Sequence, residues 1–499
     1  MKYLNLLLLI ITASVSSQNI ELKWAEKIKT KENVYILGGK NGQYFTRHRN
    51  SDKNLVCRAY DKDMTLKNEK IVSFNLDEKK YVYQGAYFLK DKIVHFIMEN
   101  VRKEDKNYLY AGITDLNLKT SDKTFVIDDA DEKAIRFGER SISPDSTKIV
   151  VYNEIRGRKK EPNTLNFKVY NTDFTEVLLN KSAQLPIKAK NFDTKSINVD
   201  NLGNVYVLAR IDKERNEKEK DQSKFYYKLI TFNKEETPKE FDFDYPEKDI
   251  ESIEILPGKN NTLICTGFLK TLGKGFLSTR MKTLISDELF SAIIDCNTLT
   301  LKSSTKYELE GLYPEKPKKT EDYVPYVVKD IFFREDGGSV VVAEQYKLWV
   351  SENMTQNGTH FYVNNYYYCD IAVIQINSKS EVESVSKMPK YQMNADNPSI
   401  ISTHVNGSTY IIYEDLEKNI KAGNDKETKM STNSNMFTSD SRNALFLLTI
   451  LPNGEMKKEI IYSYKESKIR PRIRASRVIS KNEILLNAND QIGLLKISK

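Results

Sequence analysis

Residues 196–210 read SINVDNLGNVYVLAR, and this stretch decides the fold. Two runs rich in β-branched and apolar residues, 196–200 and 204–210, lie on either side of Asn201, Leu202 and Gly203. Such runs are typical of strands, and Asn and Gly suit the positive φ angles of a tight turn. The stretch therefore predicts a β-hairpin.

This hairpin begins a longer unit that recurs along the chain. Two further strand-like runs, 225–232 and 240–245, complete a set of four. The second strand recurs at 44–49, 92–98, 148–155, 204–210, 262–268, 339–345, 408–413 and 483–487. The third recurs at 55–60, 108–115, 165–170, 225–232, 289–295, 368–376, 444–450 and 493–497. These positions predict about eight copies with a period of roughly 55 to 75 residues.

Sustained helical periodicity is nearly missing from the chain, so we expect an all-β fold. The repeat predicts a single β-propeller of about eight four-stranded blades, with seven as the alternative. The last copy ends after its third strand at 493–497, while the run 21–28 precedes the first copy. We expect these two runs to pair, because a closed ring leaves no sheet edge open.

Two short motifs resemble those of known propeller families. Residues 200–207 are similar to the D-x-x-G-N-x-Y-V repeats of bacterial propellers. Residues 142–151 resemble the S-P-D-x-x-x-I-x-[VF] hairpin of TolB-like and WD-like repeats, although the Trp-Asp and Gly-His signatures of WD repeats are missing. The resemblance, to repeats of bacterial exported propellers, implies the propeller fold and no particular activity, since one fold hosts many functions.

The N-terminus is typical of a signal peptide. Lys2 precedes the apolar run 6–11, and small residues that include Ser16 and Ser17 follow it. A membrane anchor is the alternative, but the run falls short of the roughly 20 apolar residues that cross a bilayer. We expect residues 1–18 to be a signal peptide and 19–499 the propeller domain. The mature protein would then be soluble and exported to the periplasm, the cell surface or the medium.

Charge and cysteine content narrow the classes of partner and compartment. The 77 basic and 69 acidic residues are interleaved, and a net charge of +8 without one dominant patch argues against nucleic acid as a ligand. The chain has four cysteines and no CxxC pair, so a hydrophobic core must hold the fold. Cys265 and Cys296 lie on successive predicted strands, where either a disulfide or two buried thiols can occur.

Local motifs for catalysis and metal binding are missing from the sequence. His48, His95, His360 and His404 lie in different copies, and none has the spacing of a metal-binding motif. The chain contains no GxSxG elbow and no P-loop. We therefore expect no metal and no cofactor.

Loop length distinguishes the two faces of the predicted ring. The connections between second and third strands are long at 211–224, 269–288, 346–367 and 414–443. Long connections in compact folds are commonly functional, so we expect ligands on this face. The aromatic-rich segment 346–368 contains the candidate ligand-binding residues Trp349 and Tyr362. In the alternative, both strands simply extend as a hairpin that packs its rings together.

A second group of candidates should lie near the axis on the same face, at the starts of first strands. These residues are Arg136, Arg140, Lys195, Asp249, Lys329, Asp396, Arg472 and Arg474. Most of them are basic, so their convergence would favour an anionic ligand. Separate salt bridges are the alternative.

These features favour a monomeric binding or scaffolding propeller whose partner is a protein or a carbohydrate. An exported hydrolase or lyase with its site at the mouth of the axial channel is the second hypothesis, because catalytic residues from separate blades escape a search for local motifs. A structural surface repeat protein is the third. Neither a nucleic-acid partner nor a membrane span is expected.

The signal peptide gives a first testable prediction. N-terminal sequencing of the exported protein should find a chain that begins near Gln18, because the small residues before it suit signal peptidase. A membrane-bound product that retains Met1 would contradict the prediction.

Overall fold

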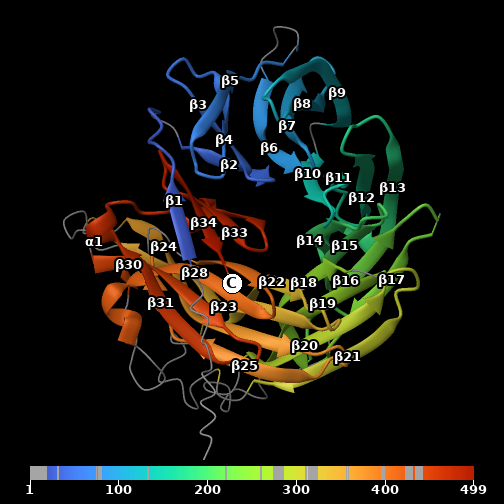
Figure 1. Ribbon diagram of the computed structural model, residues 1–499. Helices are drawn as coiled ribbons and strands as arrows, with labels where there is room; N and C mark the ends of the chain where they lie inside the picture. Colours follow the sequence, from blue (N-terminus) through green and yellow to red (C-terminus); the bar gives the residue numbers. More distant parts are fainter. Residues whose placement is uncertain are drawn as a thin grey trace, which may run out of the picture.

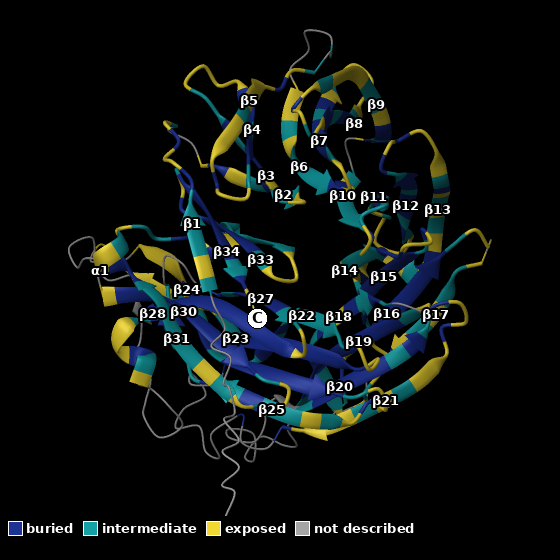
Figure 2. Ribbon diagram, viewed as in Figure 1, coloured by how far each residue is buried: buried dark blue, intermediate teal, exposed yellow. Residues whose placement is uncertain are grey.

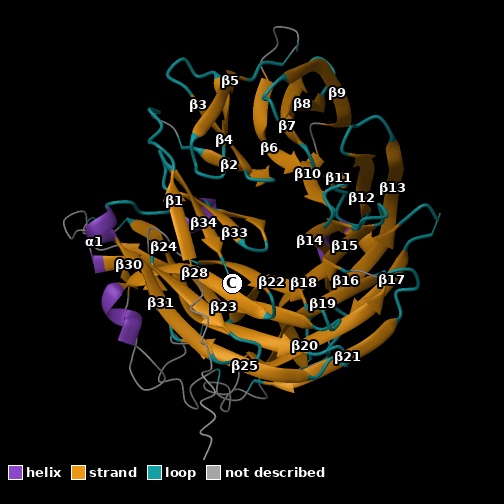
Figure 3. Cartoon of the chain, in the orientation of Figure 1, coloured by secondary structure: helices purple, strands orange, loops and turns teal. Residues whose placement is uncertain are grey.

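The computed structural model describes residues 20–30, 33–74, 76, 81–131, 134–217, 219, 222–235, 237–258, 261–272, 286–309, 312, 324–355, 357, 359–394, 399–421, 431–432 and 442–498. The predicted signal peptide lies outside these residues. Strands make up nearly all of the regular structure (Figure 3). None of the helices in these ranges is long and apolar enough to cross a membrane.

Eight antiparallel sheets follow one another around a common axis (Figure 1). The prediction of an all-β propeller is thereby confirmed, with eight blades rather than seven. In each of the first seven blades the chain passes from an innermost first strand outward.

The first four blades each contain four consecutive strands. Blade 1 consists of β2 (Tyr35–Lys40), β3 (Gln43–Arg49), β4 (Leu55–Tyr60) and β5 (Leu66–Ile71). Blade 2 consists of β6 (Tyr81–Leu89), β7 (Lys92–Val101), β8 (Lys106–Asp115) and β9 (Thr120–Asp131). Blade 3 consists of β10 (Ala134–Ile142), β11 (Lys148–Ile155), β12 (Pro162–Asn171) and β13 (Val177–Lys188). Blade 4 consists of β14 (Phe192–Val199), β15 (Val205–Asp212), β16 (Phe225–Phe232) and β17 (Lys239–Phe243).

The last four blades include two departures from this plan, an enlarged sheet and a closing strand. Blade 5 consists of β18 (Lys248–Pro257), β19 (Thr262–Thr271), β20 (Ser286–Asp295) and β21 (Leu301–Glu308). Blade 6 consists of β22 (Tyr326–Phe333), β23 (Ser339–Met354), β24 (His360–Ile376) and β25 (Val382–Met388), with the short β26 (Gln392–Met393) and β29 (Ser431–Thr432) added. Blade 7 consists of β27 (Ile400–Val405), β28 (Ser408–Leu416), β30 (Asn443–Ile450) and β31 (Met456–Ser463). Blade 8 consists of β32 (Arg477–Ser480), β33 (Glu483–Asn487), β34 (Ile492–Ile497) and β1 (Ile20–Trp24).

Short helical segments lie between some of these strands. They are the α-helix α1 (Tyr464–Ser467) and the 3-10 helices η1 (Ala189–Asn191), η3 (Glu417–Lys421) and η5 (Ile473–Ala475).

Every predicted second and third strand coincides with a strand of the structure, and 148–155 and 225–232 match β11 and β16 at both ends. The prediction differs most in blade 6, where β23 and β24 continue as a long hairpin through the segment 346–367. The extension of both strands is therefore confirmed, whereas of the expected ring packing Tyr346 and Tyr368 form a pair and Trp349, Phe361 and Tyr362 are exposed. The main parts of the predicted loops 269–288 and 414–443 lie outside the described residues.

The carboxylate of Asp200 holds together the hairpin turn in residues 196–210. Its Oδ1 accepts hydrogen bonds from the backbone N–H groups of Leu202 and Asn204, both at 2.9 Å, and its Oδ2 accepts one from Tyr206 Oη at 2.8 Å. Gly203 has a φ of 93°, which L-residues with a side chain rarely adopt. The Asp, Gly and Tyr of the motif thus build one turn.

Turns that are held by an Asp or Asn side chain recur after the third strands, and these were not predicted. In each of the first six blades an Asp or Asn side chain accepts hydrogen bonds from backbone N–H groups two to four residues later, as in Asx turns. These residues are Asp61, Asp115, Asn171, Asn233, Asp295 and Asn377. Within four such turns a buried apolar residue has a φ between 53° and 61°, namely Met64, Leu118, Phe174 and Leu299.

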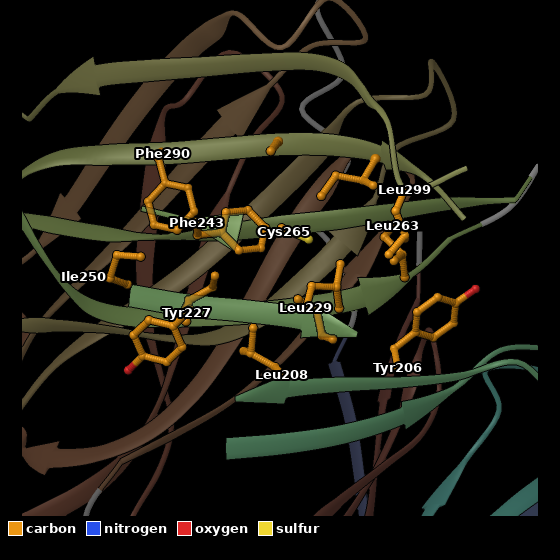
Figure 4. Close-up of a cluster of buried hydrophobic side chains, with 14 of the residues drawn as sticks. Tyr206, Leu208, Tyr227, Leu229, Phe243, Ile250, Leu263, Cys265, Phe290 and Leu299 are labelled. Atoms are coloured by element: carbon orange, nitrogen blue, oxygen red, sulfur yellow. The ribbon is translucent and has the colours of Figure 1, made fainter. Parts of the chain in front are cut away.

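The core consists of apolar layers between neighbouring blades. Between blades 4 and 5, for example, Leu208 and Leu229 pack with Leu263 and Phe290 (Figure 4). The outermost strands carry most of the exposed positions (Figure 2). All four cysteines are buried and free, so the disulfide considered for Cys265 and Cys296 is not formed.

The innermost strands crowd together at the axis. Seven of the eight first-to-second strand pairs contain a register shift, and the β27–β28 pair runs without one. In β2 a Cβ on Gly38 would lie 2.4 Å from Phe88 Cβ of blade 2. A Cβ on Gly39 would lie 2.6 Å from the Tyr44 ring. The two glycines therefore let β2 approach its neighbours.

Strand β1 closes the ring by pairing with β34. The register runs from Ile20 opposite Ile497 to Trp24 opposite Gly493, which confirms the predicted pairing of the chain ends. The Trp24 ring covers Gly493, where an added Cβ would lie 2.7 Å from the indole. Trp24 also meets Tyr462 of blade 7 edge to face at 6.5 Å. The N-terminal strand is thus the outermost strand of blade 8.

We predict that Gly493→Val opens this seam, because its side chain takes the place of the Trp24 indole. The free energy of unfolding should fall by about 1–3 kcal/mol, as for other overpacked sites. The chain has two tryptophans, so the substitution is made in a Trp349→Phe background, where fluorescence reports on Trp24 alone. Urea unfolding followed by this fluorescence and by circular dichroism measures the effect.

Glu21→Gln, at the exposed side of β1, is the matched control and should leave stability and emission unchanged. If Gly493→Val unfolds at the same urea concentration as its parent, β1 does not hold the ring closed.

Candidate functional site

The long hairpin of blade 6 forms an arm, which we define as residues 346–354 of β23 and 360–368 of β24. It occupies the connection between a second and a third strand, so it lies on the loop face, where these connections and those between blades emerge. The opposite turn face carries the short turns after first and third strands. At about 3.4 Å per residue, the nine residues of each arm strand span about 27 Å.

Strand register divides the arm into two faces, because directly opposed residues point to the same side. The front face begins with Tyr346 opposite Tyr368 and continues along every second residue. It contains Tyr346, Leu348, Val350, Glu352, Met354, His360, Tyr362, Asn364, Tyr366 and Tyr368. The back face contains Lys347, Trp349, Ser351, Asn353, Phe361, Val363, Asn365 and Tyr367. The two predicted aromatic candidates therefore point to opposite sides.

Large apolar side chains on the front face are exposed along most of its length. Tyr362 is 68% exposed and Met354 is 65% exposed, while Leu348, Val350 and Tyr366 are also exposed. On the back face Trp349 is 40% exposed, with Phe361 and Val363 exposed beside it. Exposed apolar side chains at this density are typical of interaction surfaces.

Two of the predicted basic residues contact the base of the arm, by which we mean Tyr346 and Tyr368, where the front face joins blade 6. The Tyr346 and Tyr368 rings lie 5.0 Å apart, and Lys329 Nζ is 5.7 Å from the centre of each. The Arg474 guanidinium lies 5.2 Å from the centre of the Tyr368 ring, and its Nη2 donates a hydrogen bond of 2.6 Å to Tyr368 Oη. Arg474 is exposed. The front face is thus flanked by cations where it joins the blade and exposes apolar side chains further along the arm.

A buried ionic network anchors this base. Glu344 and Lys390 are both fully buried and form an ion pair at 2.6 Å. Lys329 Nζ lies 3.1 Å from the other Glu344 oxygen, which also accepts a hydrogen bond from Ser399 at 2.9 Å. Lys390 further donates to Gln392 of β26, the short strand that pairs with the arm at Tyr368. Since solvent does not reach the pair, its role is to hold the base in place.

The remaining basic candidates lie away from the arm and have protein partners. Arg136 of β10 donates to Glu139 at 3.1 and 3.2 Å and to the Thr194 carbonyl at 2.7 Å. The Arg140 guanidinium lies 4.4 Å from the centre of the Phe96 ring, and its burial lowers its pKa. Lys195 forms an ion pair with Asp193 of the same strand.

Arg472 and Asp249, also predicted to lie near the axis, each form hydrogen bonds within the protein. Arg472 Nη1 donates to the side chains of Asn33 and Asn489, both at 3.1 Å. Asp249 accepts a hydrogen bond of 2.7 Å from Ser223. Asp396 lies outside the described residues. The structure therefore brings Lys329, Arg474 and Tyr362 onto one surface, and among the candidates that it describes it places the others elsewhere.

Sequence reasoning missed the aliphatic part of the front face, Leu348, Val350 and Met354. These residues occupy every second position after Tyr346, apart from Glu352, and a period of two is the alternation of a strand. Reading that alternation through residue 354 would have found them. The Glu344–Lys390 pair left no local signal, since 46 residues separate its partners.

Among the four histidines, His48 and His95 are buried, His404 is partly buried and His360 is exposed. His95 is fully buried between Tyr83 Oη and Thr114 Oγ1, each 3.0 Å from a ring nitrogen, and burial lowers its pKa to about 3. His360 lies on the front face, 2.7 Å from Glu352. Within the described ranges, no group of three or more His, Cys, Asp or Glu side chains could hold a metal ion.

No protein-family model matches the chain, and no curated protein sequence matches it. Among solved structures, the WD40 domain of SCAP from fission yeast is similar with a TM-score of 0.42 at 9% identity, over 97% of this chain and 98% of that one. An oligogalacturonate lyase from Vibrio parahaemolyticus has a TM-score of 0.36 at 10% identity, over 96% and 98% of the two chains. The BP39L lectin from Burkholderia pseudomallei has a TM-score of 0.36 at 8% identity, over 88% and 100%. Likenesses at this level carry no inference about ligand or activity.

Proposed function

We propose that the protein is an exported binding propeller that engages a protein partner through the front face of the arm. The observation that carries the proposal is the row of exposed apolar side chains from Leu348 to Tyr362, which continues into the cationic base at Arg474. Export rests on the signal-peptide pattern of residues 1–18.

The composition of the front face favours a protein over a carbohydrate. Leu348, Val350 and Met354 are aliphatic and offer no hydrogen bonds to sugar hydroxyls, and the polar pair beside Tyr362, Glu352 and His360, is bonded to itself at 2.7 Å. A projecting ribbon also lacks the concave shape that encloses a small ligand. Apolar and aromatic side chains at the centre of a contact are typical of protein interfaces.

Charge at the base indicates which partner chemistry fits. Lys329 is already paired with Glu344, but Arg474 forms no ion pair with any carboxylate in the described part of the chain. We therefore expect a partner segment with apolar side chains for the arm and an acidic residue that reaches Arg474. Such a contact would weaken as salt concentration rises.

A photocrosslinking amino acid at position 362 tests the proposal, with the same amino acid at position 361 as the control on the back face. In the cells that make the protein, position 362 should crosslink to a partner and position 361 should not. The partner is then purified, and its affinity is measured by calorimetry for the parent and two double variants. Leu348→Ser/Tyr362→Ser on the front face should weaken binding by about 30-fold or more, because such exposed anchors are the usual hot spots.

Trp349→Ser/Val363→Ser removes comparable apolar surface from the back face and should leave the affinity within about twofold, as expected of a surface outside the contact. Equal loss in both double variants would contradict the choice of face. Glycan-array binding that depends on Tyr362, or self-association as the only crosslink, would overturn the protein partner.

A further inference from the structure

The turn face contains a cavity that the arm does not use. Its volume is about 410 Å³, within the range of pockets that hold small molecules. Residues of the innermost strands β32, β2 and β6 and of the turns after β6 and β10 line it, so blades 8, 1, 2 and 3 contribute. β2 and β6, two of these strands, lie beside each other next to the axis (Figure 1). The cavity is therefore axial and lies on the face opposite to the arm.

Three of the side chains around the cavity are cations without a carboxylate partner. Lys40 and Lys90 are exposed, and Arg477 is partly buried. None of the three forms an ion pair with a described carboxylate. Asp145, the acidic residue of the lining, already accepts hydrogen bonds from Ser143 Oγ at 2.6 Å and from Thr147 N at 3.0 Å. With three cations and one carboxylate that is already hydrogen-bonded, the lining of the cavity has a net charge of +2.

The wall of the cavity fixes the Arg477 guanidinium in position. Arg477 Nη1 donates a hydrogen bond of 2.6 Å to the carbonyl of Leu37. Leu37 is the residue skipped by the register shift between Ile36 and Gly38, so its carbonyl lies outside the β2–β3 ladder. Burial lowers the pKa of Arg477, which marks a cation that lacks full hydration. A buried, oriented cation is suited to an anionic group.

We propose that this cavity binds a small anion through a carboxylate or phosphate group, with Arg477 at its base and Lys40 and Lys90 at its rim. Gly38 and Gly39 line the same cavity and carry no side chain to fill it. The size of the cavity limits the ligand to a small molecule, and its charge excludes a cationic one. The site is independent of the arm, so either can be correct without the other.

Calorimetric titration of the mature protein at low ionic strength tests the proposal, with inorganic phosphate and citrate as separate probes. At least one probe should bind saturably with one site per chain, and the stronger probe distinguishes a phosphate from a carboxylate ligand. Lys40→Gln/Lys90→Gln should weaken that binding by about tenfold or more, since charge-assisted hydrogen bonds are lost. Bound anion should also raise the melting temperature of the parent more than that of this variant.

Lys103→Gln/Lys379→Gln removes two exposed lysines from outside the cavity and is the matched control for net charge. It should bind the probe as the parent does. Arg477→Gln should abolish binding if the variant folds. If it does not fold, the comparison of the two lysine double variants still tests the proposal. Absence of saturable binding of both probes, or equal weakening in both lysine double variants, would overturn the proposal.

Discussion

Close packing at the axis is the constraint on which the rest of the ring depends. Neighbouring innermost strands contact each other around it, as β2 contacts β6 and β18 contacts β22. Where β2 passes Phe88, the contact requires glycine, and seven of the eight first-to-second strand pairs contain a register shift. One such shift releases the Leu37 carbonyl, which then orients Arg477. The irregular pairing of β2 thus supplies the acceptor that positions a cation in the wall of the axial cavity.

The strands could be read from the sequence because their signals are local. Alternating apolar residues and turn residues such as Gly203 mark each strand within a few positions, and the predicted strands coincide with the observed ones. The Asp or Asn after each of the first six third strands was equally visible. Aligning the copies on that residue would have revealed the Asx turns.

The site could be predicted only in part, because its geometry depends on register and on distant partners. The aromatic density of 346–368 identified the arm, but whether Trp349 and Tyr362 share a face depends on where the hairpin turns. A shift of one residue would exchange the faces. The charge pairs were harder to predict, since Lys329 meets Glu344, and Arg136 meets Glu154 and Asp193, through contacts between strands. Pairing of this kind leaves no pattern in one sequence.

The seam between β1 and β34 also sets the order in which the molecule can be completed. Ile20 pairs with Ile497, so 477 positions separate the two partners along the chain. Bringing such distant segments together costs conformational entropy on the order of 5 kcal/mol by loop-closure scaling. Strand β1 is synthesised before the other strands, yet it can pair only after β34 has been made, whichever blades form earlier. An exported chain would therefore finish folding only after the whole of it has crossed the membrane, and until then blade 8 presents an open edge on which folding factors could act.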